Sequence, residues 1–163
     1  MHKFTMIYLD LDGVIADFRK RYLELFQTSP ENDDNRKRFG DRFAKFIHSK
    51  EFATLDLMPD ALELLSHLTT TGVPVEILSS TARPVSNVTI SHQKQTWLDN
   101  HGITYPAVFV PGKQFKAKYA NPNSILIDDT YSNIEEWNKA GGVGILHKDA
   151  IDTISILNTL LRG

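Results

Sequence analysis

The sequence of 163 residues contains no cysteine. Disulfides, thiolate nucleophiles and cysteine-ligated zinc are therefore excluded, and the composition fits a reducing compartment. Long apolar runs are also missing. The first run ends at Asp10, which is too short for a signal peptide, and none approaches the roughly 20 residues that span a bilayer. These features predict a cytoplasmic protein with no membrane partner.

The sequence also lacks a large excess of positive or negative charge. The sequence has 18 Lys and Arg against 20 Asp and Glu, which gives a formal net charge of −2. Nothing global attracts such a chain to nucleic acid, so we expect no stable nucleic-acid complex. The glycines form neither a dinucleotide-binding fingerprint nor a Walker-type phosphate loop. The oligomeric state stays open.

Short apolar runs alternate with helical patterns along most of the chain. The apolar runs, each bounded by turn residues, cover 4–10, 75–80, 107–110, 124–129 and 143–146. The helical patterns cover 60–72, 91–102, 133–142 and 149–161. In the first helix, Leu62, Leu65 and Leu68 are expected to share one face. This alternation predicts an α/β fold with a doubly wound parallel sheet of about five strands.

Residues 17–58 interrupt the alternation, because they contain no run typical of a strand. They instead suggest one helix with an aromatic face, a polar loop, and a second helix that is basic and aromatic. We interpret them as a small helical cap, inserted after the first strand over the carboxyl edge of the sheet. The core would then comprise residues 1–16 and 59–163.

Four aspartates follow two of the predicted strands. Asp10 ends the first apolar run and Asp12 follows in a turn that Gly13 permits, while Asp128 and Asp129 end "SILIDD". A single aspartate after a strand is more often a cap or a turn residue. Two acidic strand ends side by side would repel each other without a cation, however, and hard oxygen ligands favour Mg²⁺ or Ca²⁺. A compact site that keeps waters favours Mg²⁺.

These residues carry a family resemblance. The segment "DLDGV" at 10–14, Ser79 in "ILSS", a lysine before the fourth strand and "ILIDD" at its end resemble the four motifs of the haloacid dehalogenase-like phosphohydrolases. Within that superfamily, "DLDGVIADF" and "EFATLDLMPDA" (51–61) are similar to the 5′(3′)-deoxyribonucleotidases and their bacterial and phage relatives.

The resemblance implies a role for each matching residue. Asp10 would be the nucleophile that forms an aspartyl-phosphate, and Asp12 the general acid and base, a residue that dehalogenase-type relatives lack. Ser79 and Ser80 would bind a phosphoryl oxygen. Mg²⁺ would be held by Asp10, by the backbone carbonyl of Asp12 and by the acidic pair. Of that pair, we favour Asp129 as the direct ligand and Asp128 as an indirect or water-mediated one.

The lysine of the third motif is ambiguous, because Lys113, Lys116 and Lys118 all precede the fourth strand. The spacing in the deoxyribonucleotidases suggests Lys118, whereas a helix over 114–120 would bring Lys116 nearer the catalytic edge. Both stay candidates.

Two further residues are candidates for substrate binding. Phe18 matches a substrate-contacting phenylalanine of the deoxyribonucleotidases, and its ring could stack on a nucleobase. Arg83, in "SSTARP", would either reach the phosphate or cap its loop.

The sequence thus predicts a Mg²⁺-dependent phosphomonoesterase that hydrolyses a small phosphorylated metabolite. The favoured substrate is a (deoxy)nucleoside monophosphate, which would make the protein a 5′-nucleotidase. The alternative enzymes are a 3′-phosphatase that acts on nucleic-acid ends and a sugar-phosphate phosphatase. A non-catalytic binding protein with the same fold is the alternative of another class.

Overall fold

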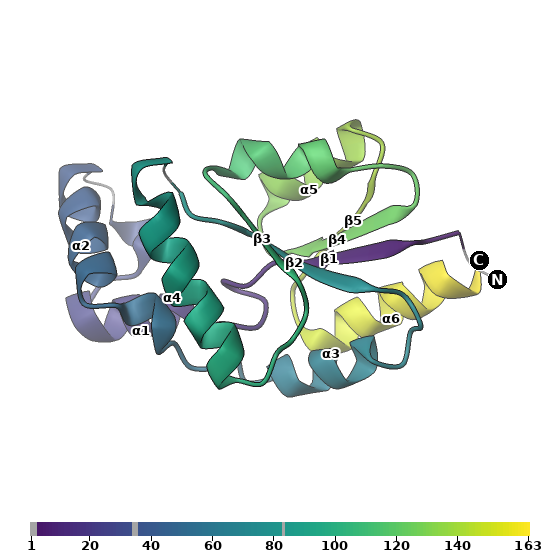
Figure 1. The fold of residues 1–163 in the computed structure, drawn as a ribbon, viewed down its shortest axis with the longest axis horizontal. Helices are drawn as coiled ribbons and strands as arrows, with labels where there is room; N and C mark the ends of the chain where they lie inside the picture. Colours follow the sequence, from purple (N-terminus) through teal and green to yellow (C-terminus); the bar gives the residue numbers. More distant parts are fainter. Residues whose placement is uncertain (1–2, 34–35, 83) are drawn as a thin grey trace.

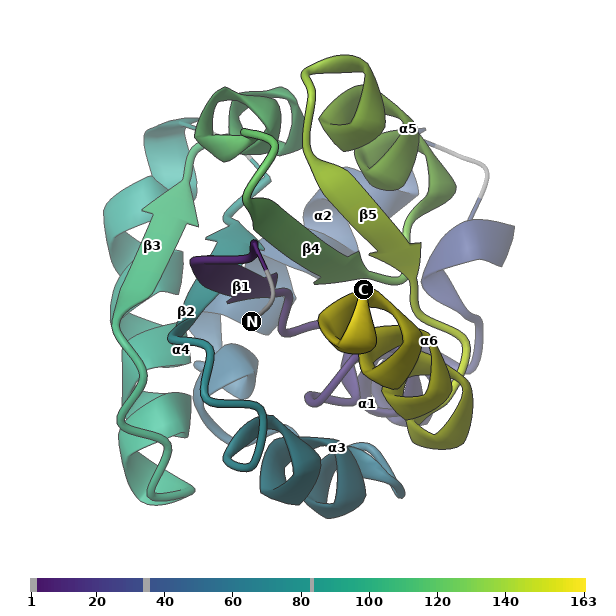
Figure 2. The same cartoon turned by 90° about the vertical axis from the view of Figure 1, so that its right-hand side faces the viewer.

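The structure is a computed structural model that describes residues 3–33, 36–82 and 84–163. Its strands form one parallel sheet in the order β3-β2-β1-β4-β5, with β1 in the middle (Figure 2). The strands are β1 (Met6–Leu9), β2 (Val75–Ser80), β3 (Ala107–Val110), β4 (Ser124–Asp128) and β5 (Val143–Leu146). The predicted α/β fold with about five parallel strands is confirmed.

Helices cover both faces of the sheet because its strands are apolar on both faces. In β1, Ile7 and Leu9 belong to one core cluster, whereas Tyr8 packs against a second cluster that contains Trp137. The first cluster lies under α3 (Ala61–Leu68), α4 (Asn87–Asn100) and α6 (Ala150–Arg162). The second lies under α5 (Tyr131–Lys139) and the 3₁₀ helix η4 (Lys113–Tyr119). Among the described residues, no helix is long and apolar enough to cross a bilayer.

The predicted apolar face of α3 is wrong in one position. The buried residues of this helix are Ala61, Leu64 and Leu68, whereas Leu62 is 69% exposed. The prediction followed the leucines alone. The helix begins at Ala61, and the face that starts there passes through Leu64, which leaves Leu62 one position out of register.

A helical segment lies between β1 and α3, beyond the carboxyl ends of the strands (Figure 1). It comprises α1 (Phe18–Phe26), η1 (Pro30–Asn32), α2 (Arg36–His48) and η2 (Glu51–Ala53). The chain leaves the sheet and returns to it at one place. The Asp17 N–H donates to the Asp56 carbonyl, and the Met58 N–H donates to the Ile15 carbonyl, both at 2.8 Å. We call residues 17–58 the inserted segment.

Candidate active site

The sheet order brings the two acidic strand ends together. Strands β1 and β4 are neighbours, with Leu9 opposite Ile127, so Asp10 and Asp128 emerge at the same edge. Carboxylate oxygens of Asp10, Asp128 and Asp129 lie within 4.8 Å of one another. This edge, where a parallel sheet of this kind changes its winding direction, is where such sheets bind ligands.

A buried lysine bridges the two strand ends. The Nζ atom of Lys116 donates to Asp10 Oδ1 at 3.0 Å and to Asp128 Oδ2 at 2.8 Å. Lys118, the other candidate, is exposed and lies against the rings of Phe115 and Tyr119. The geometry therefore brings Lys116, and not Lys118, into contact with the aspartates.

The carboxylates make this site electrostatically costly. Burial and the charge of Asp128 raise the pKa of Asp10, while Lys116 acts in the opposite direction. Partial burial of its carboxylate and the charge of Asp128 also raise the pKa of Asp129. Burial alone would lower the pKa of Lys116, but the charges of Asp10 and Asp128 outweigh it, so that pKa is raised. A single ammonium group does not neutralise the cluster, and hard oxygen donors at this spacing suit a divalent cation.

The two members of the acidic pair differ in how far the protein satisfies them. Asp128 is fully buried and accepts from Lys116, from the Thr130 N–H at 2.9 Å and from Asn133 Nδ2 at 3.0 Å. Asp129 is exposed, and its Oδ1 accepts a longer bond of 3.3 Å from Thr130 Oγ1. Protein donors thus occupy both oxygens of Asp128, which leaves Asp129 the freer carboxylate.

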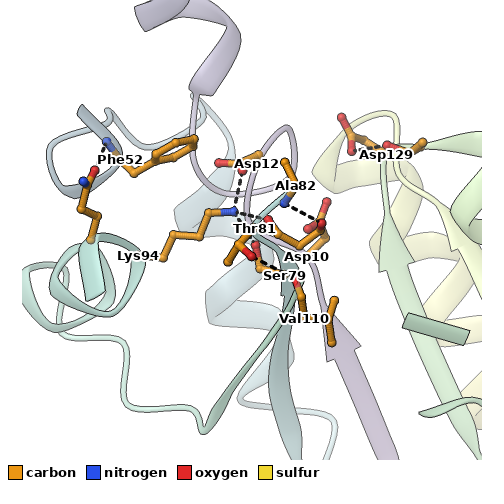
Figure 3. A network of polar contacts seen from close by, with 12 residues as sticks. Asp10, Asp12, Phe52, Ser79, Thr81, Ala82, Lys94, Val110 and Asp129 are labelled. Carbon is orange, nitrogen blue, oxygen red and sulfur yellow. Dashed lines mark hydrogen bonds and ion pairs between the residues drawn. The ribbon is translucent and has the colours of Figure 1, made fainter. Parts of the chain in front are cut away.

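Lys94 is a site residue that the sequence analysis missed. Its Nζ atom, which α4 brings into the site, donates to Asp12 Oδ2 at 2.9 Å, to Ser79 Oγ at 2.7 Å and to the Ser80 carbonyl at 2.9 Å (Figure 3). The side chain is only 3% exposed. A signal was present, since Lys94 lies at helical spacing between Ile90 and Trp97, on the face that should be apolar.

A cavity of about 550 Å³ connects this cluster to the inserted segment. At one end it is lined by the aspartates, the lysines and the serines, including Asp10, Asp12, Lys94 and Ser79. Its other side is a set of phenylalanines, which we call the aromatic wall: Phe18, Phe39, Phe43 and Phe52. The rings of Phe18 and Phe52 stack with centroids 5.6 Å apart and planes 5° apart.

The predicted site residues can now be placed. The residues at the polar end of the cavity include Asp10, Asp12, Ser79, Ser80, Lys116 and Asp129. Asp128 lies directly behind Asp10 and Lys116, and Phe18 is part of the aromatic wall. Lys118 is not among the lining residues. Arg83 lies outside the described residues.

Several solved structures that resemble this chain are described as hydrolases. A hydrolase from Streptococcus pneumoniae TIGR4 has a TM-score of 0.57 at 17% identity, over 96% of this chain and 99% of that one. A Had-superfamily hydrolase from Ehrlichia chaffeensis has a TM-score of 0.59 at 12% identity, over 99% of both chains. A HAD family hydrolase from Deinococcus radiodurans R1 has a TM-score of 0.54 at 14% identity, over 96% of this chain and 89% of that one. At these identities the likeness shows the fold alone, and the chain shares the fold of these hydrolases.

A match between the sequence and a family model shows the family of the protein, which the fold alone does not. Residues 4–153 match the model of the family described as 5′ nucleotidase, deoxy (pyrimidine), cytosolic type C protein. The chain belongs to this family, and it is a phosphoric monoester hydrolase related to the deoxyribonucleotidases. No curated protein has a sequence that matches the chain significantly. The family match confirms the predicted resemblance to the haloacid dehalogenase-like phosphohydrolases and, among them, to the deoxyribonucleotidases.

Proposed function

We propose that the protein is a Mg²⁺-dependent 5′-nucleotidase that hydrolyses a (deoxy)nucleoside monophosphate through an aspartyl-phosphate. The observation that carries this proposal is the division of the cavity. Its polar end holds Asp10, Asp12, Ser79, Lys94 and Lys116, and its other side is the aromatic wall. A phosphate ester fits the first part and a nucleobase fits the second.

The chemistry would proceed in two displacements at phosphorus. A carboxylate oxygen of Asp10 attacks the phosphorus atom, the bond to the ester oxygen breaks, and Asp12 gives that oxygen its proton. Asp12 then takes a proton from a water molecule as the water oxygen attacks the same phosphorus. The bond to Asp10 breaks, and inorganic phosphate leaves. Each displacement returns Asp12 to the protonation state that the next one needs.

The cations of the protein would bind the phosphoryl oxygens. Lys94 already donates to Ser79 and Asp12, so a phosphate beside them would meet its ammonium group together with the Ser79 hydroxyl. Lys116, which we propose as the third-motif lysine in preference to Lys118, would hold Asp10 in place for attack. Ser80 would contribute a further polar contact, and Arg83 would either reach the phosphate or cap its loop.

The carboxylates also fit Mg²⁺. We propose that Asp10, the backbone carbonyl of Asp12 and Asp129 would hold the ion directly. Asp128, whose oxygens accept bonds from Lys116, Asn133 and Thr130, would support them from behind. A bound Mg²⁺ would offset the repulsion between the carboxylates and the charge on the phosphoryl oxygens.

The aromatic wall and the family both support the proposed substrate class. A wall of phenylalanine rings favours a flat, stacking leaving group over a bare sugar, and the family description names nucleotidases. We propose that the inserted segment, residues 17–58, is a cap that recognises the base, while residues 1–16 and 59–163 carry out the chemistry. The family description, which reads cytosolic type, supports a cytoplasmic reaction.

Phosphate release from a panel of substrates tests the proposal. The panel contains nucleoside 5′-monophosphates, sugar phosphates and 3′-phosphorylated oligonucleotides, each with Mg²⁺ and with EDTA. We expect Mg²⁺-dependent release that is fastest from the mononucleotides. A preference for oligonucleotide ends or for sugar phosphates would identify one of the alternative enzymes, and no release at all would favour a binding protein.

The Asp12→Asn variant tests the proposed mechanism separately. Turnover should fall by about 10²- to 10⁴-fold, the usual contribution of a positioned acid and base. The binding of Mg²⁺ should survive, because Asp12 would offer the ion only its backbone carbonyl. Loss of Mg²⁺ binding in this variant would instead make the Asp12 side chain a ligand.

A further inference from the structure

Two polar side chains lie on the buried face of α4, where a helix that covers a sheet normally carries apolar residues. The buried positions are Ile90, Gln93, Lys94, Trp97 and Leu98. Burying an amide or an ammonium group is unfavourable unless it finds hydrogen-bond partners. The partners of Lys94 belong to the reaction centre. The partners of Gln93 do not, so its burial needs a separate explanation.

Gln93 is bonded through both ends of its amide to the backbone of the inserted segment. Its Oε1 accepts from the Phe52 N–H at 3.2 Å, and its Nε2 donates to the Ile47 carbonyl at 2.8 Å. Ile47 lies in the last turn of α2 and Phe52 in η2, on either side of the turn that joins them. One side chain of the core therefore fixes two parts of the inserted segment.

Phe52, whose backbone is bonded to Gln93, also lines the cavity. Its ring is part of the aromatic wall, where it stacks on Phe18. The centroid of the same ring lies 5.3 Å from Lys94 Nζ. Figure 3 shows the Phe52 ring next to the Lys94 side chain. Because Gln93 holds the Phe52 backbone, it sets the distance between the aromatic wall and the lysine at the polar end of the cavity.

The two hydrogen bonds of Gln93 act together with the packing of the buried Phe52 ring against Phe43 and Phe46. An open crevice of about 460 Å³ lies beside Gln93, lined by Ile47 and His48 of α2 and by Thr89 of α4. Shortening the side chain, or replacing its amide with an apolar group, would remove a polar link between the two helices that border this crevice. The Phe52 backbone would then be held less tightly, by ring packing against Phe46 and by the bond from Trp97 Nε1 to the Leu55 carbonyl.

We propose that Gln93 is a positioning residue that holds Phe52 in place for the nucleobase and so sets the affinity for nucleotides without touching the substrate. This inference rests on the proposed nucleotidase function. None of the bonds of Lys94 to Asp12, Ser79 and Ser80 involves Gln93, so we expect them, and with them the chemical step, to survive a change of Gln93.

The first test compares Gln93→Met with Gln95→Met. The Gln95 amide bonds to Asp99 within α4 and so serves as the matched control. The substrates are a deoxynucleoside 5′-monophosphate and ribose 5-phosphate, which lacks a base. In Gln93→Met we expect KM for the nucleotide to rise about 5- to 30-fold, the effect of losing one or two buried hydrogen bonds. The kcat values and the KM for ribose 5-phosphate should stay near those of the wild type.

The second test adds another variant and a measurement that does not depend on activity. A Gln93→Glu carboxylate can still accept from the Phe52 N–H, but it has no donor for the Ile47 carbonyl and meets that oxygen with a buried negative charge. Its KM for the nucleotide should therefore rise at least as far as that of Gln93→Met. Hydrogen–deuterium exchange at the Phe52 amide should be fastest in Gln93→Met and slower in Gln93→Glu.

Two results would overturn the positioning role and leave the proposed function standing. One is an equal rise of KM for the nucleotide and for ribose 5-phosphate, and the other is unchanged exchange at Phe52. A wild-type enzyme that hydrolyses no nucleotide would remove the proposed function itself, and this inference with it.

Discussion

Gly13 shows how a single residue shapes the site. Its φ of +83° lies in the left-handed region, and a Cβ atom there would overlap the Asp129 carboxylate. Gly72 has a similar φ of +74° but open space around it, which makes it a matched control. We expect Gly72→Ala to lower the free energy of unfolding by about 1 kcal/mol, the cost of a left-handed alanine.

Gly13→Ala should lose more stability than that control and should also lose activity, because Asp129 must move. Urea denaturation and kcat, both measured with Mg²⁺, check this expectation. A Gly13→Ala enzyme as stable and as active as Gly72→Ala would show that Asp129 does not need its observed position.

Lys116 and Lys118 give a second comparison between residues. Lys116→Met would leave Asp10 and Asp128 buried without their cation, which should cost about 3–5 kcal/mol of stability and abolish turnover. Lys118→Met should change stability by less than about 0.5 kcal/mol, since that side chain is exposed. Chemical denaturation and phosphate release measure both effects. A greater loss of turnover in Lys118→Met would reverse the assignment of the third-motif lysine.

The sequence predicted the aspartates of the site better than its lysines. Asp10 and Asp128 end strongly apolar strands, so their positions follow from local pattern and sheet topology. Lys94 reaches Asp12, a residue 82 positions away, and no local pattern shows that contact. The same holds for Lys116, whose role depends on how the chain before β4 folds back over Asp10.

Among the elements, α3 allows a direct test of its buried face. Leu64 is fully buried, whereas Leu62 is 69% exposed. Leu64→Ala should therefore destabilise the protein by about 2–5 kcal/mol through lost burial and a cavity. Leu62→Ala should cost less than about 0.5 kcal/mol. Thermal and urea unfolding would compare the two, and similar losses would contradict the observed register of the helix.

Strands were predicted more closely than helices. The runs 75–80, 107–110 and 143–146 coincide with β2, β3 and β5, because strands buried on both faces are short and continuously apolar. The predicted helix 91–102 begins later than α4, which starts at Asn87. Gln93 and Lys94 interrupt the apolar pattern on the buried face of α4, and their hydrogen-bond partners lie in other parts of the chain.

At the scale of the whole molecule, the fold brings the carboxylates of Asp10, Asp128 and Asp129 close together, which costs stability. We explain this cost by the function of the site. Burial and the charge of Asp128 raise the pKa of Asp10 from its ordinary value of 3.8 to about 8. The folded protein therefore binds this proton more tightly than the unfolded chain does. The resulting stability is present below about pH 4 and is lost as the pH rises toward 8.

Asp10→Asn removes this pH dependence while keeping an oxygen that can accept the bond from Lys116. In EDTA at pH 8 the variant should melt at a higher temperature than the wild type, and the difference should vanish toward pH 4. In a chain of this size, each kcal/mol of stability corresponds to about 2–4 °C in melting temperature.

Mg²⁺ should raise the melting temperature of the wild type more than that of the Asp10→Asn variant, because the variant lacks one charged ligand. Turnover should be lost at every pH, since an amide is a poor nucleophile. Melting curves from pH 4 to pH 9, with EDTA or with Mg²⁺, measure the whole set. A variant that melts below the wild type in EDTA at pH 8 would show that the Asp10 carboxylate stabilises the fold through Lys116 more than it strains it.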